Sequence, residues 1–293
     1  MFDNGPLYCN MMRKLFTLFL VLLSAQNIFS QSAPKGHLFI IGGGKRSPEL
    51  MRSMLATAGI GPKDYIVVLP MASEEADTAF YYVKSSLERL CNNTIADLNF
   101  TKDRILDKKW VDSVQHAKLI FISGGDQSRF MNVVRNSPLY TAIHKAFENG
   151  ATIAGTSAGA AVMSKYMITG NELRGDTAYH ENFRRLWNKN LEIKEGLGLL
   201  PNAIIDQHFI MRSRYNRLIS AIAQFPTMPC IGIDEATAII ISGNKVKVAG
   251  ESQVILIRQP DGLKVTDKGL IKFNDLHFSI FTAGDEFDLQ RKE

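Results

Sequence analysis

The chain has 293 residues but only three cysteines, and one of these, Cys9, precedes the longest apolar run. The remaining two, Cys91 and Cys230, are too few for a fold built on disulfides, although they could pair or stay as buried thiols. The six histidines are scattered and do not combine with the cysteines in the spacing of a zinc site. We therefore expect neither a structural metal nor a metal-dependent reaction.

Long runs of basic residues are also absent. Lysine and arginine number 34 against 29 acidic residues, a net charge of +5, and no aromatic RNA-binding motif accompanies them, so a nucleic-acid partner is not expected. The stretch Gly42-Gly43-Gly44-Lys45-Arg46 fits neither the phosphate-loop spacing nor the dinucleotide fingerprint. We expect no nucleotide and no other cofactor.

No apolar stretch is long enough to span a bilayer, which takes about 20 residues. The run 15–25 has eleven, follows Arg13-Lys14 and precedes a polar segment that ends at Ser30. This pattern predicts a signal peptide over residues 1–30, a buried amino-terminal helix being the alternative. Residues 1–10 make an unusual start for such a segment, so translation could begin at Met11 or Met12. The mature chain is then expected to be secreted or periplasmic and not to associate with a membrane.

From residue 37 onward, short β-branched runs alternate with helical patterns. The expected strands are 37–41, 65–69, 95–100, 118–123 and 152–155, and the expected helices include 48–58, 74–91, 127–135 and 138–148. Such alternation predicts an α/β fold with a parallel sheet covered by helices on both faces. No linker interrupts it, so residues 31–293 are expected to form a single domain, with 245–293 as an antiparallel, β-rich extension.

Three of the expected strands end in glycine-rich turns: 42–44, 124–125 and 155–159. The last turn, Gly-Thr-Ser-Ala-Gly, holds Ser157 among small residues. Such a turn can serve a close crossing of strand and helix, or it can expose a nucleophilic serine. In parallel sheets, sites lie beyond the carboxyl ends of strands, so the three turns converge if their strands are neighbours.

A serine nucleophile needs a base, and His208 is the best-placed histidine. It ends the apolar run 203–207 and precedes a helix, where a strand could deliver it to the site, although an edge histidine bonded to backbone would look the same. Arg212, Arg214 and Arg217 follow at the start of that helix, where cations oppose the helix dipole. The three arginines either bind carboxylates or form a solvated helix face.

These stretches together resemble a known family. "GTSAGAAVM" from 155, "DQHF" from 206, the Arg-x-Arg-x-x-Arg spacing and "SGGDQ" from 123 are similar to the cyanophycinases, within the S51 serine peptidases that also include aspartyl dipeptidase. The resemblance extends over about residues 37–240. It implies the parallel-sheet, three-layer sandwich of class I glutamine amidotransferases.

The resemblance also implies an activity. Such enzymes are exopeptidases that cut cyanophycin, a polyaspartate carrying arginine on each side-chain carboxyl, into β-aspartyl-arginine. Ser157 would be the nucleophile, His208 the base, and the N–H groups of Gly125 and Ala158 the oxyanion donors. Arg214 and Arg217 are expected to hold substrate carboxylates, and Asp206 to be structural or to meet the guanidinium. The full expected substrate pocket is Gln127, Asp206, Gln207, Arg212, Arg214 and Arg217.

The triad acid is less clear from the sequence. The family places an acid after the serine helix, where Glu172 is favoured because it lies nearest the end of the strand-like run 166–169, with Asp176 as the alternative. Either could instead be a solvated turn carboxylate. Expected partners are cyanophycin or a β-aspartyl peptide, and the sequence leaves the oligomeric state open, a homodimer included.

Two other functions remain open: an aspartyl or β-aspartyl dipeptidase, and a catalytically silent binding protein of the same fold. A conventional α/β-hydrolase is disfavoured, because only 51 residues separate Ser157 from His208.

Overall fold

A twisted eight-stranded sheet forms the centre of the protein in the computed structural model, which describes residues 34–175 and 181–290. The expected signal peptide and Asp176 lie outside the described residues. In spatial order the strands are β16 (Glu286–Asp288), β11 (Lys245–Gly250), β10 (Thr237–Ser242), β1 (His37–Ile41), β5 (Thr152–Thr156), β4 (Leu119–Ile122), β2 (Tyr65–Leu69) and β3 (Thr94–Asp97). From β1 to β3 every pairing is parallel.

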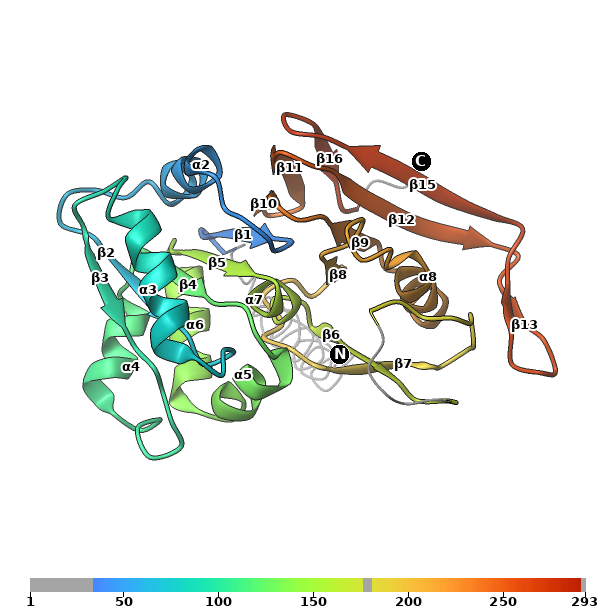
Figure 1. Cartoon of the computed structure of the whole chain (residues 1–293), viewed down its shortest axis with the longest axis horizontal. Coiled ribbons are helices and arrows are strands. Elements are labelled where there is room, and N and C mark those ends of the chain that lie inside the picture. The colour runs from blue at the N-terminus through green and yellow to red at the C-terminus, as the bar shows by residue number, and fades with distance from the viewer. Residues whose placement is uncertain (1–33, 176–180, 291–293) are drawn as a thin grey trace, which may run out of the picture. The chain divides into compact units, whose positions relative to one another are not determined.

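The central strands are buried on both faces, which explains why they read as continuous apolar runs. Alternate side chains go to different layers: Phe39 and Ile41 pack with α2 and α3, whereas Leu38 and Ile40 pack with the helices of the other face. The helices are α2 (Pro48–Ala58) and α3 (Ala76–Leu87) on one face, and α4 (Lys108–Gln115), α5 (Gln127–Val134), α6 (Pro138–Glu148) and α7 (Ala158–Ala161) on the other (Figure 1).

The helices begin at residues suited to capping. The Ser47 side chain accepts from the Leu50 N–H at the start of α2, and Asp126 accepts from the Ser128 and Arg129 N–H groups at the start of α5. Each such cap stabilises its helix by about 1 kcal/mol. Since only Ser123, Gly124 and Gly125 separate Asp126 from the end of β4, its cap also fixes how the chain leaves the sheet.

A second sheet lies beside the first and contains β15 (Asp275–Phe281), β12 (Val254–Asp261), β9 (Cys230–Ile233) and β8 (Ile204–Gln207), in that order. Its helix α8 (Tyr215–Gln224) packs on it through a cluster that includes Leu218 and Ile222 (Figure 1). Two ribbons complete the fold: β6 (Tyr166–Glu172) with β7 (Leu191–Glu195), and β13 (Lys264–Val265) with β14 (Ile271–Lys272).

The predicted α/β class with a largely parallel main sheet is confirmed. The strands from residue 245 onward all pair antiparallel, but they divide among three sheets: β11 and β16 widen the main sheet, β12 and β15 join the second, and β13 and β14 form their own ribbon. In the described residues, Cys91 and Cys230 are free thiols, and burial raises the pKa of Cys230. No helix in the described ranges is long and apolar enough to cross a membrane.

Candidate active site

Ser157 lies in a sharp turn between β5 and α7. Its φ is +54°, an uncommon conformation for a residue other than glycine, and its N–H donates to Ile41 O of β1 at 3.1 Å. A Cβ on Gly155 would overlap the Gly159 carbonyl, and one on Gly159 would overlap the Ile122 carbonyl. The small residues therefore allow three backbones to cross closely, and the crossing holds the serine in its strained position.

His208 comes from the end of β8 and reaches the serine. Its Nε2 lies 2.7 Å from Ser157 Oγ, and its backbone N–H donates to Gly42 O at 2.8 Å. A Cβ on Gly43, whose φ is +125°, would clash with the His208 ring. The triple-glycine turn is thus the surface against which the histidine packs.

The other ring nitrogen, Nδ1, lies 2.6 Å from Oε1 of Glu235. Glu235 follows β9, the strand paired in parallel with β8, so two adjacent strand ends deliver the histidine and the carboxylate. Next to it, Ala236 has a φ of +54° and donates its N–H to Gly43 O at 2.9 Å. The connection from β9 to β10 is therefore held against the same turn as the histidine.

The structure corrects the choice of Glu172 as the residue that orients His208. Glu172 is buried at the end of β6, where its Oε2 accepts from Nδ2 of Asn190 at 2.6 Å, and Glu235 takes the position beside the ring. The alternative, Asp176, lies outside the described residues. The sequence held a partial signal for Glu235: two acids, Asp234 and Glu235, follow the buried run Cys230–Ile233, much as His208 follows Ile204–Gln207.

The surroundings of His208 favour its neutral form. Burial is the main cause that lowers the pKa of His208, the charges of Arg212 and Arg214 lower it further, and Glu235 opposes them. With the proton on Nδ1 donated to Glu235, Nε2 is free to accept the Ser157 hydroxyl proton. This arrangement of hydrogen bonds is the one that a general base requires.

A cavity of about 270 Å³ opens over Ser157 and His208. The structure brings to it most of the residues expected from the sequence, and four others that sequence reasoning missed: Asp126, Ser128, Thr169 and Asn171. The lining residues that the sequence predicted are Gly125, Gln127, Gln207, Arg212, Arg214 and Arg217. Asp206 is buried beside the cavity, and Ala158 follows the serine at the start of α7.

The three arginines of the cavity, Arg212, Arg214 and Arg217, differ in the hydrogen bonds and ion pairs that they form within the protein. Nε of Arg217 donates to Asp206 Oδ2 at 2.7 Å and its Nη2 donates to Oδ1, a buried bidentate pair. Arg217 was expected to hold a substrate carboxylate, whereas in the structure Asp206 fills that side of its fork. Nη1 of Arg214 donates to the carbonyl and to the side-chain oxygen of Gln207. Because its carboxylate is paired with Arg217, Asp206 has a structural role in the site.

Arg212 is the most accessible of the three, with its side chain 32% exposed and Nε 3.6 Å from Oε1 of Glu181. On another side of the cavity, Nε2 of Gln127 donates to the Ile168 and Thr169 carbonyls at 3.0 and 2.7 Å. Gln127 thus ties the start of α5 to β6. In the described residues, no group of three or more histidine, cysteine or acidic side chains is arranged to hold a metal.

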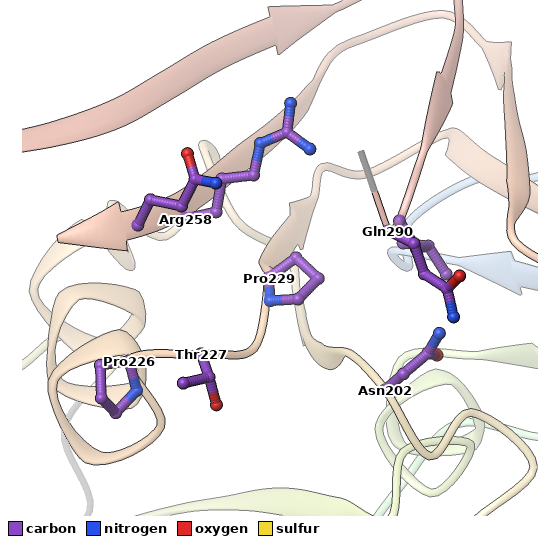
Figure 2. A pocket seen from close by; sticks show the side chains of 8 residues that line it. Asn202, Pro226, Thr227, Pro229, Arg258 and Gln290 are labelled. Atoms are coloured by element: carbon purple, nitrogen blue, oxygen red, sulfur yellow. The ribbon is translucent and has the colours of Figure 1, made fainter. Parts of the chain in front are cut away.

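A larger cavity, about 550 Å³, lies elsewhere, between the turn after α8 and the carboxyl-terminal segment (Figure 2). Prolines, amides and a leucine dominate its lining, and Arg258 of β12 is its charged member. Size therefore does not mark the reactive site in this protein. The smaller cavity is distinguished by a serine and a histidine in hydrogen-bond contact.

Comparison with known proteins shows the family of the chain. The model of peptidase family S51 matches residues 38–249. A cyanophycinase from Nostoc sp. is 32% identical, covering 89% of this chain and 88% of its own. Another, from Geminocystis herdmanii, is 30% identical over 87% and 94%. Peptidase E from Pasteurella multocida is 25% identical over 52% of this chain and 62% of its own.

Among solved structures, a peptidase from an acI-B1 Actinobacterium superposes with a TM-score of 0.62 at 22% identity, covering 89% of this chain and all of that one. This likeness bears on the fold alone. The family model and the cyanophycinase relatives bear on the chemistry, since they span most of the chain. The protein belongs to peptidase family S51 and is a serine-type peptidase.

Proposed function

We propose that this peptidase hydrolyses cyanophycin and releases β-aspartyl-arginine, with Ser157, His208 and Glu235 as its triad. The observation that carries the proposal is the unbroken series of short contacts, 2.7 Å from serine to histidine and 2.6 Å from histidine to glutamate, at the wall of an arginine-lined cavity. The substrate is inferred from the cyanophycinase relatives. The positive charges of the cavity suit a substrate that carries carboxylates.

In this mechanism, Ser157 Oγ attacks the backbone carbonyl on the carboxyl side of an aspartate whose side chain bears arginine. His208 Nε2 takes the hydroxyl proton, and Glu235 stabilises the imidazolium that results. The tetrahedral intermediate collapses, the C–N bond breaks, and His208 gives the proton to the leaving amine. Water, deprotonated by the same histidine, then hydrolyses the acyl-serine ester and regenerates the hydroxyl.

Two backbone N–H groups are available for the oxyanion. Gly125 lines the same cavity as Ser157, and Ala158 follows Ser157 in the sequence. Within the described part of the chain, the N–H groups of both residues donate to no protein acceptor, so they can bind an oxyanion. Gly125 has a φ of +137°, and a Cβ there would overlap the Ala72 carbonyl, so glycine is needed to shape this turn. Each donor would stabilise the transition state by about 3 kcal/mol.

Arg212 and Arg214 are the proposed ligands of a substrate carboxylate. Both line the cavity, and Arg212 has the more accessible guanidinium. Guanidinium groups bind carboxylates through two parallel hydrogen bonds, which would orient the polymer chain relative to Ser157. Arg217, held by Asp206, is assigned to the support of this wall.

The test is to incubate the chain from Gln31 onward with insoluble cyanophycin and to identify soluble products by mass. Release of β-aspartyl-arginine that stops in Ser157→Ala supports the proposal. Retained polymer binding by that variant would separate recognition from catalysis.

An aspartyl dipeptidase is the second candidate, favoured by the partial similarity to Peptidase E. If the polymer stays intact while small aspartyl peptides are cleaved by the wild type and not by Ser157→Ala, this activity replaces the first. A wild type that binds the polymer but cleaves neither substrate would point to a binding protein.

We also propose that the protein is exported, on the basis of the charged, apolar and polar segments before Gln31. Digestion of a polymer made by another cell requires an enzyme outside the cytoplasm. Amino-terminal sequencing of protein from the periplasm and the culture fluid of its host tests this, with Gln31 as the expected first residue. Full-length protein confined to the cytoplasm would contradict it.

A further inference from the structure

The β6–β7 ribbon contributes Thr169 and Asn171 to the cavity that contains Ser157. Between Ile168 and Glu172 the pairing with β7 shifts register, and Gly170 has a φ of +97°. Irregularities of this kind turn side chains away from the direction that a regular strand would give them, and they are common beside active sites. The ribbon is therefore shaped at the two residues that reach the cavity.

Both of these side chains are bonded to one carboxylate, Glu192 of β7. Thr169 Oγ1 donates to Glu192 Oε2 at 2.6 Å, and Asn171 Nδ2 donates to the same oxygen at 3.0 Å. These bonds leave Oδ1 of Asn171 as an acceptor. The neighbouring Gln127 has the same polarity, because both N–H bonds of its amide are taken by β6 carbonyls, which leaves Oε1 as an acceptor.

Glu192 also supplies negative charge to this wall. The hydrogen bond from Thr169 is the main cause that lowers the pKa of Glu192, partial burial opposes it, and Asn171 and Lys194 lower it further. Lys194 Nζ lies 3.4 Å from the other oxygen, Oε1, but its side chain is 47% exposed, so solvent screens much of that pair. The carboxylate is ionised at neutral pH, and its Oε2 faces the two cavity residues.

We propose that Glu192, through Thr169 and Asn171, makes this wall of the cavity selective for a cationic side chain. The substrate's guanidinium would bind the acceptors of β6, while Arg212 takes a carboxylate of the same substrate. Glu192 is a positioning residue in this scheme: it orients the two side chains and adds charge behind them, and it takes no part in bond breaking. The inference rests on the proposed function, because it names how that site distinguishes arginine from a neutral side chain.

The experiment compares the binding of β-aspartyl-arginine and β-aspartyl-citrulline by calorimetry. Citrulline has nearly the shape of arginine but no charge. All variants carry Ser157→Ala, so that binding is measured in a protein without peptidase activity. Ser157→Ala alone should prefer the arginine ligand, and added Glu192→Gln should weaken that ligand about tenfold while leaving citrulline unchanged. Glu192→Asp should restore part of the preference.

The matched control is Glu195→Gln, which removes one negative charge from the same strand at an exposed residue that does not line the cavity. It should leave both affinities unchanged. The inference is overturned if Glu192→Gln keeps the arginine preference, weakens both ligands equally, or if Ser157→Ala itself shows no preference. Failure of the proposed function is seen separately, as wild-type enzyme that releases no dipeptide from cyanophycin.

Discussion

His208 is held from both sides of its ring, by Ser157 at Nε2 and by Glu235 at Nδ1. When the ring takes a proton, it becomes a cation in a buried position beside Arg212 and Arg214, which disfavour it. Glu235 is the anion in direct contact that offsets this effect. Its contribution should therefore be larger in the transition state than in the resting enzyme.

The first prediction concerns this carboxylate. Glu235→Gln should lower kcat by roughly 10³- to 10⁴-fold, because the amide stabilises neither the imidazolium nor the required tautomer. Glu172→Gln is the matched control, since its contact is with Asn190, and it should leave kcat within about threefold. Steady-state hydrolysis of a β-aspartyl-arginine peptide measures both. Equal loss in the two variants would contradict the assignment.

The second prediction concerns pH. The base works only when it is neutral, and the pKa of His208 is lowered from 6.5. As the pH is decreased, kcat/KM should therefore keep its maximal value until the pH is below 6.5, and decrease only at lower pH. Glu235→Gln removes the influence that raises the pKa and should move this acid limb to lower pH. Arg212→Gln removes a cation that lowers it and should move the limb to higher pH.

The control for this profile is Arg52→Gln, which removes an exposed cation paired with Glu49 on α2. Its acid limb should coincide with that of the wild type. An Arg212→Gln limb that does not move, or moves to lower pH, would show that His208 is not the titrating base.

Some of the site residues could be predicted from the sequence, and others could not. Ser157 and His208 could be found because each follows a buried strand and has the chemistry of its role. Glu235 follows a strand in the same way, but it precedes another apolar run, and its nearness to His208 depends on the pairing of β8 with β9. Sequence order favoured Glu172, whereas strand pairing selects Glu235.

At the scale of elements, the three glycine-rich turns act together because β1, β5 and β4 are neighbours. This convergence was predicted from the sequence, but the purpose of the first turn was not. Gly43 and Gly44 make room for His208 and for Glu235, whose Cβ lies 2.7 Å from where a Cβ on Gly44 would be. Their use depends on close packing between segments about 160 residues or more apart in sequence, which no local pattern reveals.

The third prediction tests this packing. Gly43→Ala should displace the His208 ring and lower kcat by at least about 10²-fold. Gly243→Ala is the control, because Gly243 also has a positive φ, +62°, but no atom lies within 4 Å of its added Cβ. That variant should keep kcat and lose only about 1 kcal/mol of stability from backbone strain. Kinetics and thermal melts measure the two effects, and an active Gly43→Ala enzyme would contradict this role.

For the whole molecule, the site lies where the two sheets meet. The main sheet supplies the serine and the glycine turns, the second sheet supplies His208 and Glu235, and the short connection from β9 to β10 carries the chain from one sheet to the other. The sequence predicted the alternation of strands and helices and the antiparallel carboxyl-terminal strands. It could not predict that β11 and β16 join one sheet while β12 and β15 join the other, because that depends on pairings between distant segments.

The fourth prediction concerns the buried pair that supports this junction. Arg217→Met should lower the free energy of unfolding by about 3–5 kcal/mol, because Asp206 stays buried without its bidentate partner. Arg212→Gln breaks the half-exposed pair with Glu181 and should cost no more than about 1 kcal/mol. Urea denaturation measures both. Similar stabilities would mean that Arg217 serves the substrate rather than the fold.

The most direct test of the central claim, that three distant segments assemble one activated serine, is covalent labelling with a fluorophosphonate followed by peptide mass mapping. We predict a single adduct on Ser157, lost in His208→Ala, greatly slowed in Glu235→Gln, and formed at the wild-type rate in Glu172→Gln. An adduct on another residue, or labelling of Ser157 that does not depend on His208, would contradict the account.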